Sequence, residues 1–85
     1  MGEARRTTLR DCKEGDRVVI TGIRPGTLSK RLREMGFNPD TEVRIVKYAP
    51  LKNPIEVVVK GYHVSLRLEE AEWIEVEHIV DEASS

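Results

Sequence analysis

The stretch from Arg31 to Val46 constrains the fold most, because it joins the end of a helix to a strand with little chain between them. Leu28, Leu32 and Met35 recur at positions i, i+4 and i+7, which predicts one apolar stripe on a short amphipathic helix. From residue 42 to residue 48 the apolar period falls to two, which is typical of a strand. We therefore expect a short helix packed directly against a β-strand.

The turn between this helix and strand has its own chemistry. Gly36 stands where a helix commonly ends in a left-handed residue, because glycine adopts positive φ without a Cβ clash. Pro39 cannot continue a helix, and with its neighbours it predicts a tight turn. Asp40 tolerates the left-handed region better than most residues. The helix should therefore stop at Gly36.

The other apolar residues alternate in short runs, which predicts an all-β chain around the single helix. We expect strands over residues 16–23, 42–48, 55–60, 62–68 and 73–77. One domain over residues 9–80 and flexible tails at 1–8 and 81–85 complete the expected organisation. The expected core consists of Val18, Ile20, Ile23, Leu28, Leu32, Met35, Val43, Ile45, Ile55, Val57, Val59, Val64, Leu66, Ile74 and Val76.

Five short strands in 85 residues cannot bury their inner faces as a flat sheet. Strongly bent strands that close into a small barrel would bury these faces and would also remove exposed sheet edges. The sequence therefore predicts a small β-barrel with one helix inserted after its first strand.

Charge and composition limit the classes of function that this chain can have. Charged residues make up 34% of the chain and the formal net charge is −1, whereas a general nucleic-acid binder is expected to be strongly basic. Residues 1–33 carry a net charge of +5 and residues 34–85 a net charge of −6, which permits oriented docking to a charged partner. No apolar run is longer than three residues, the length of Val57–Val59, so we expect no membrane insertion. The single Cys12 fits a reducing compartment, so we expect a cytoplasmic protein.

Catalytic and metal sites are not evident in the sequence. It contains no Ser/His/Asp or Cys/His arrangement and no phosphate-binding glycine loop, so we expect no enzyme. Cys12, His63 and His78 are each isolated, whereas a structural zinc site normally uses ligands in close pairs. Cys12 fits beneath the first strand as a small apolar residue, and His63 fits an exposed strand position. His78 follows the last strand among acidic residues, Glu75, Glu77 and Asp81, which form either a weak ligand set or an ordinary acidic rim. We therefore expect no intramolecular metal site and no cofactor.

Two groups of residues are candidates for contact with a partner protein. The first lies just beyond the ends of the predicted elements and consists of Phe37, Tyr48, Pro50, Leu51 and Tyr62. If several of them share one surface, they form the kind of apolar patch that marks a binding site; otherwise Phe37 closes the helix cap and Tyr62 covers a barrel end. The second group is the basic helix face formed by Lys30, Arg31 and Arg33, which is otherwise a solvated surface.

Four motifs in a fixed order make the chain similar to a known family. They read RLREMG at 31–36, NPDTEV at 38–43, APLKNPIEV at 49–57 and KGYHVSLRLEEA at 60–71. The pattern runs from Leu9 to Val76 and resembles the FeoA family, although Asp40 stands where we expect that family to favour glycine.

The resemblance implies both a fold and a function. It implies an SH3-like β-barrel and a small, non-enzymatic accessory protein of ferrous iron uptake, in a family associated with iron homeostasis and transition metals. The implied partner is the cytoplasmic domain of the membrane transporter FeoB, which would hold the protein at the membrane, and a weak homo-oligomer is compatible with this role. The alternative is a small nucleic-acid-binding β-barrel that uses the basic helix face.

Overall fold

The computed structural model describes residues 7–48 and 53–79 of the 85-residue chain. Its elements, in chain order, are β1 (Thr7–Thr8), the 3-10 turn η1 (Leu9–Asp11), β2 (Arg17–Ile23), α1 (Ser29–Glu34), β3 (Glu42–Tyr48), β4 (Ile55–Val59), β5 (Tyr62–Leu66), α2 (Leu68–Ala71) and β6 (Ile74–His78). All strand pairs are antiparallel, and their order in the sheet is β1-β6-β2-β3-β4-β5.

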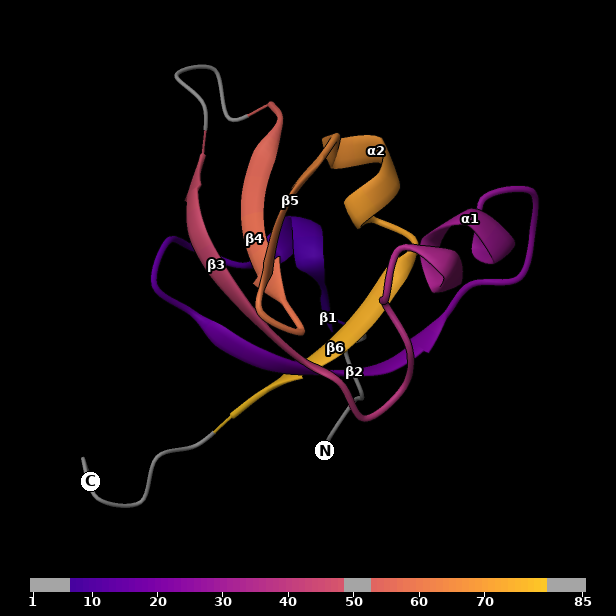
Figure 1. The fold of residues 1–85 in the computed structure, drawn as a ribbon, viewed down its shortest axis with the longest axis horizontal. Coiled ribbons are helices and arrows are strands. Elements are labelled where there is room, and N and C mark those ends of the chain that lie inside the picture. The colour runs from indigo at the N-terminus through magenta and orange to yellow at the C-terminus, as the bar shows by residue number, and fades with distance from the viewer. Residues whose placement is uncertain (1–6, 49–52, 80–85) are drawn as a thin grey trace, which may run out of the picture.

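The sheet is bent around its core but is not closed by hydrogen bonds. Figure 1 shows β2 and β6 running across the base of the molecule, while β3, β4 and β5 rise from it. Register shifts between Ile20 and Gly22 and between Ile45 and Lys47 mark irregularities of the kind that bend strands. Within the described residues β1 and β5 remain the two edges, so the predicted closed barrel is an open, strongly curved sheet.

The helix and its turn follow the sequence-based expectation. Gly36 has φ +108° and Asp40 has φ +71°, so both adopt the left-handed conformation that the sequence predicted. The amide of Phe37 donates to the carbonyl of Leu32 at 3.1 Å, which satisfies a helix-end acceptor. Leu32 is completely buried, and its neighbours on the stripe are partly buried against the core. The helix is therefore held to the sheet mainly through Leu32.

The buried core differs from the predicted list at several positions. Leu9, Cys12, Phe37 and Ala71 are buried core residues that the predicted list omits. Four residues on that list are instead only partly buried, namely Ile23, Leu28, Met35 and Val64. Leu9 and Ala71 are buried because η1 packs against α2, a contact between distant segments that a local pattern does not show.

The N-terminal boundary differs from the predicted tail. Thr7 and Thr8 form β1 and pair with Val76 and Glu75 of β6, so the predicted tail of residues 1–8 is wrong at these two positions. Two consecutive threonines have no apolar alternation, but threonine has a high β propensity. The side of β6 that is not paired with β2 is available to these residues. Thr7 and Thr8 therefore belong to the sheet.

Candidate functional site

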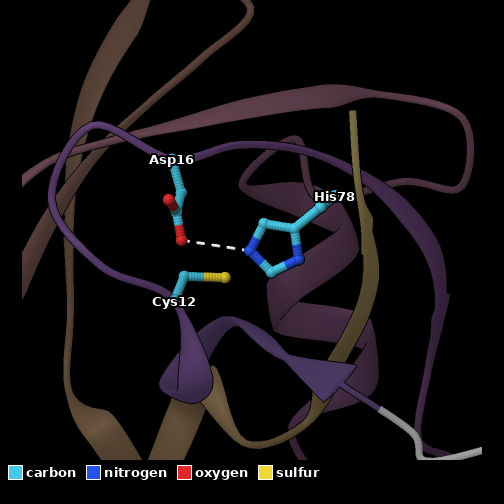
Figure 2. Close-up of side chains that lie close together, drawn as sticks. All are labelled: Cys12, Asp16 and His78. Carbon is cyan, nitrogen blue, oxygen red and sulfur yellow. Dashed lines mark hydrogen bonds and ion pairs between the residues drawn. The ribbon is translucent and has the colours of Figure 1, made fainter. Parts of the chain in front are cut away.

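Cys12, Asp16 and His78 converge where the end of β6 lies beside the start of β2 (Figure 2). The thiol sulfur, a carboxylate oxygen and a ring nitrogen all lie within 4.8 Å of one another, and together they are the one such group in the parts of the chain that the structure describes. Cys12 follows η1, Asp16 precedes β2, and His78 is the last residue of β6. Two distant segments, the loop between η1 and β2 and the end of β6, therefore bring together three different kinds of donor atom.

A tight turn positions Asp16. Its carboxylate accepts a hydrogen bond from the backbone amide of Lys13 at 2.8 Å, and its own amide donates to the Lys13 carbonyl at 3.0 Å. Its carbonyl accepts from the amide of Ile45 at 2.9 Å, which fastens the turn to β3. The Lys13 amide and, to a lesser degree, the neighbouring His78 hold the pKa of the Asp16 carboxyl below its usual value.

The pairing of β6 with β2 positions His78. His78 lies opposite Val18 in the sheet, and the next amide, that of Ile79, donates to the carbonyl of Arg17 at 3.0 Å. From this position the imidazole Nε2 lies 3.0 Å from the Asp16 carboxylate, while about half of the His78 side chain remains exposed. The histidine therefore faces both the aspartate and the solvent.

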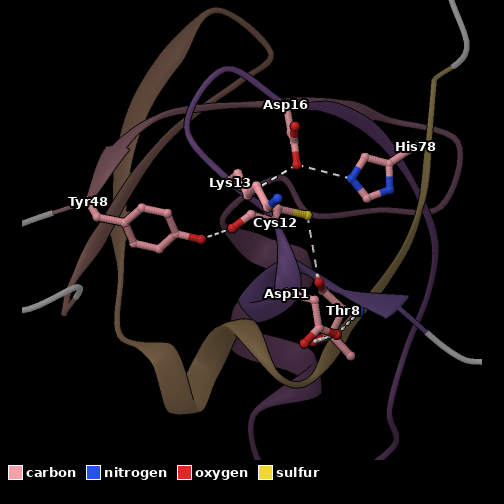
Figure 3. Close-up of polar contacts among 7 residues, drawn as sticks. All are labelled: Thr8, Asp11, Cys12, Lys13, Asp16, Tyr48 and His78. Carbon is pink, nitrogen blue, oxygen red and sulfur yellow. Dashed lines mark hydrogen bonds and ion pairs between the residues drawn. The ribbon is translucent and has the colours of Figure 1, made fainter.

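Cys12 is the buried member of the group. Its thiol lies 3.6 Å from the carbonyl oxygen of Thr8, to which it donates, and its own carbonyl accepts a hydrogen bond from the Tyr48 hydroxyl (Figure 3). Burial, aided by the negative charges of Asp16 and Asp11, raises the pKa of the thiol to about 12. The free thiol is therefore protonated at neutral pH and has little nucleophilic reactivity.

The predicted isolation of the three donor residues is only partly correct. His63 lies apart from the cluster, on β5, where its Nδ1 is 2.9 Å from the carboxylate of Glu56. Cys12 and His78 meet, although 66 positions separate them in the chain, and the sequence analysis did not single out Asp16. No local spacing points to this group, because it depends on the register between β2 and β6.

In the described part of the chain, the three aromatic residues of the first candidate group do not share one surface. Phe37 has no exposed surface, so its assignment to a partner-binding surface is corrected to a core position beneath the helix end. Tyr48 pairs with Ile55 and Tyr62 pairs with Val59, at opposite ends of β4, so these two tyrosines do not share one surface. Tyr62 is 73% exposed and Tyr48 is partly buried.

The remaining two residues of the first candidate group, Pro50 and Leu51, fall outside the described residues, and their role stays a sequence-based prediction.

The basic helix face borders a groove. Lys30, Arg31 and Arg33 are all exposed on α1, and the guanidinium of Arg31 lies 3.9 Å from the carboxylate of Glu70 in α2. A groove of about 410 Å³ is lined by Arg31, Asn53, Pro54, Ser65, Arg67 and Glu70. One edge of this groove thus comes from the predicted basic face, and another comes from the end of the predicted proline-rich loop.

Known proteins share this sequence pattern and this fold. A sequence model of the FeoA domain matches residues 7–78, which is most of the chain. The chain belongs to the FeoA family. FeoA proteins are accessory proteins associated with ferrous iron transport and are not a known enzyme family. No helix in the described part of this FeoA chain is both long and apolar enough to cross a membrane.

A curated relative links the FeoA family to a transporter. The chain is 40% identical over 78 residues to an Fe(2+) transport protein A/Fe(2+) transporter FeoB fusion protein of Porphyromonas gingivalis. The match covers 91% of this chain and 9% of the relative, so the chain spans about a tenth of that protein's length.

Solved FeoA structures confirm the fold class. An FeoA-like protein from Clostridium acetobutylicum has a TM-score of 0.85 at 30% identity, with 93% of each chain covered. FeoA of Stenotrophomonas maltophilia, solved as a zinc complex and described as a prokaryotic SH3 domain protein, has a TM-score of 0.71 at 30% identity, with 92% of this chain and 93% of that chain covered. The expectation of a mainly β, SH3-like fold is confirmed.

Proposed function

We propose that this FeoA chain is a non-enzymatic accessory protein of ferrous iron uptake that binds the cytoplasmic part of the transporter FeoB. The observation that carries the proposal is the relative in which an FeoA region and FeoB form one polypeptide. Joining two domains gives each a high effective concentration near the other. An FeoA domain that binds FeoB needs a contact surface of its own, on the cytoplasmic side of the membrane.

We assign this contact surface to the groove between α1 and β5. Arg31 and Arg67 border it, and an arginine keeps its charge in an interface while its planar guanidinium binds carboxylates and carbonyls. The Arg31 side chain is 66% exposed, so its contact with Glu70 leaves it accessible. Pro54 stiffens one wall of the groove and lowers the entropy lost on binding. These features suit an acidic or carbonyl-rich segment of the partner.

Reversing the charge of Arg31 tests the assignment. Arg31→Glu should weaken binding to the isolated cytoplasmic domain of FeoB at least tenfold, measured by biolayer interferometry at physiological salt. The free energy of unfolding should change by less than about 1 kcal/mol, because the Arg31 side chain is 66% exposed and its 3.9 Å contact with the mostly buried Glu70 carboxylate is long for an ion pair. Arg44→Glu is the matched control, since Arg44 is exposed on β3, makes the same change of charge and does not line the groove.

The outcomes separate the surface from the function. If both variants weaken binding to the FeoB domain equally, or if neither weakens it, the contact surface lies elsewhere on the molecule. A wild-type protein that does not bind the FeoB domain at all would contradict the proposed function. In that case, binding of RNA or DNA that weakens steeply with salt would favour the alternative of a nucleic-acid-binding barrel.

A further inference from the structure

We propose that Cys12, Asp16 and His78 form a binding site for one divalent transition-metal ion of the zinc type (Figure 2). Zinc binds sulfur at about 2.3 Å and nitrogen or oxygen at about 2.0–2.2 Å, so atoms that share one ion lie roughly 3–4 Å apart. The three donor atoms lie within 4.8 Å of one another, and modest side-chain rotations bring them onto one ion. The proposal does not depend on binding to FeoB.

The donor types select the class of metal. One thiol, one imidazole and one carboxylate suit zinc, cobalt and ferrous iron, whereas calcium and magnesium prefer all-oxygen sites. Three protein ligands leave a fourth position of a tetrahedral ion open to water or to another molecule. Such an open site differs from a closed structural zinc site, which uses four protein ligands.

Hydrogen bonds and strand pairing hold the ligand residues in place before any ion binds. The Lys13 amide fixes the Asp16 carboxylate, and the Tyr48 hydroxyl holds the carbonyl of Cys12 (Figure 3). The pairing of His78 with Val18 sets the direction of β6 beside them. Little ordering entropy therefore remains to be lost when an ion binds, which favours affinity.

Two of the three ligand side chains are open to solvent. About half of the His78 side chain and about a quarter of the Asp16 side chain are exposed, whereas Cys12 is only 3% exposed. An ion can therefore exchange its water for the imidazole and carboxylate first and for the sulfur last. Binding forms one bond to each donor atom, breaks the S–H bond of Cys12 and releases that proton to solvent, because a metal-bound thiol is deprotonated.

Comparison with His63 shows how the cluster of Cys12, Asp16 and His78 differs from an ordinary ion pair. His63 lies 2.9 Å from Glu56, much as His78 lies 3.0 Å from Asp16, and both histidines are largely exposed. Neither His63 nor Glu56 belongs to a group of three possible metal ligands in the described residues. The His63–Glu56 pair is therefore a matched control for the His78–Asp16 pair within the same protein.

Metal titration of the full chain tests the proposal. Protein freed of metal with EDTA is titrated with Co²⁺ and followed by absorption, and with Zn²⁺ and followed by calorimetry. We expect saturation at one equivalent, a thiolate-to-cobalt charge-transfer band in the near ultraviolet, and loss of that band when Zn²⁺ is added. Cys12→Ser and His78→Ala should each weaken binding at least tenfold, whereas His63→Ala should leave it unchanged.

Three results would overturn the proposal: no saturable binding, saturable binding without the thiolate band, or an equal loss in His63→Ala. Circular dichroism and thermal unfolding establish whether each variant is folded. If buried Cys12→Ser fails to fold, the test rests on the wild-type band and on His78→Ala, because His78 is exposed and its removal leaves no cavity in the core.

Discussion

The phenolic hydroxyl of Tyr48 donates a hydrogen bond to the backbone carbonyl of Cys12, 36 residues earlier in the chain (Figure 3). The bond ties the end of β3 to the turn that carries Cys12 and Asp16. The amide of the same tyrosine donates to the carboxylate of Glu14 at 2.9 Å, so Tyr48 contacts this turn twice. Tyr48 is therefore a structural anchor for the candidate metal site.

Tyr48→Phe removes the hydroxyl and keeps the ring. We expect the free energy of unfolding to fall by about 0.5–1.5 kcal/mol, the usual net contribution of one hydrogen bond, when measured by urea denaturation. Tyr62→Phe is the control, because the Tyr62 side chain is 73% exposed, and it should change stability by less than about 0.5 kcal/mol. Equal effects of the two substitutions would show that the Tyr48 hydroxyl contributes no stability.

Leu32→Ala tests how the helix is attached. Leu32 is the one completely buried residue of α1, and its truncation leaves a cavity between the helix and the sheet. We expect a loss of about 2–5 kcal/mol in the free energy of unfolding. Exposed Lys30→Ala on the same helix should cost less than about 0.5 kcal/mol. A loss below about 1 kcal/mol for Leu32→Ala would mean that the helix does not depend on this contact.

Gly26→Ala tests a close approach between the loop before α1 and the only tryptophan. A Cβ at Gly26 would lie 2.3 Å from the Trp73 ring, and the residue has φ +151°. We expect a loss of about 1–3 kcal/mol, as for other overpacked sites, together with a shift in tryptophan fluorescence.

Gly15→Ala separates the two contributions to that loss. Gly15 has φ +90° but nothing within 4 Å of its Cβ position, so this substitution carries backbone strain without a clash. Its fluorescence should match that of the wild type. A fluorescence shift of the same size in both variants would mean that the Gly26–Trp73 contact does not cause it.

The reactivity of Cys12 provides a fourth prediction. Because burial raises the pKa of its thiol to about 12, very little thiolate exists at pH 8 in the metal-free protein. Alkylation by iodoacetamide in EDTA should therefore be at least tenfold slower in native protein than in protein unfolded by urea, as measured by mass spectrometry. Equal rates in the two states would contradict the burial of this thiol.

The helix end and the strands could be predicted because they depend on nearest neighbours. Leu28, Leu32 and Met35 mark one face of a helix, and Gly36 and Asp40 adopt the backbone conformations that their side chains favour. Alternation also identified most of the buried strand residues, because successive side chains of a strand point to opposite faces of the sheet.

Phe37 shows what local reasoning left open. It follows the helix, and its position beyond the periodic pattern fitted either a partner-binding surface or a residue that closes the helix cap. The turn at Gly36 directs the chain back toward the sheet, and the amide of Phe37 bonds to the carbonyl of Leu32, so the ring is buried completely. An aromatic side chain just after a helix end has no periodic neighbour to reveal whether it faces the core.

The sequence by itself determined the local elements, most of the core and the family. Only the tertiary structure decided that Asp16 and His78, 62 residues apart, lie in contact with each other and near Cys12. Alternating residues specify which face of a strand is buried, but they do not specify its neighbour or its register. Those depend on which distant strands together bury the most apolar surface, and here that requirement pairs β6 with β2 and brings His78 to the turn.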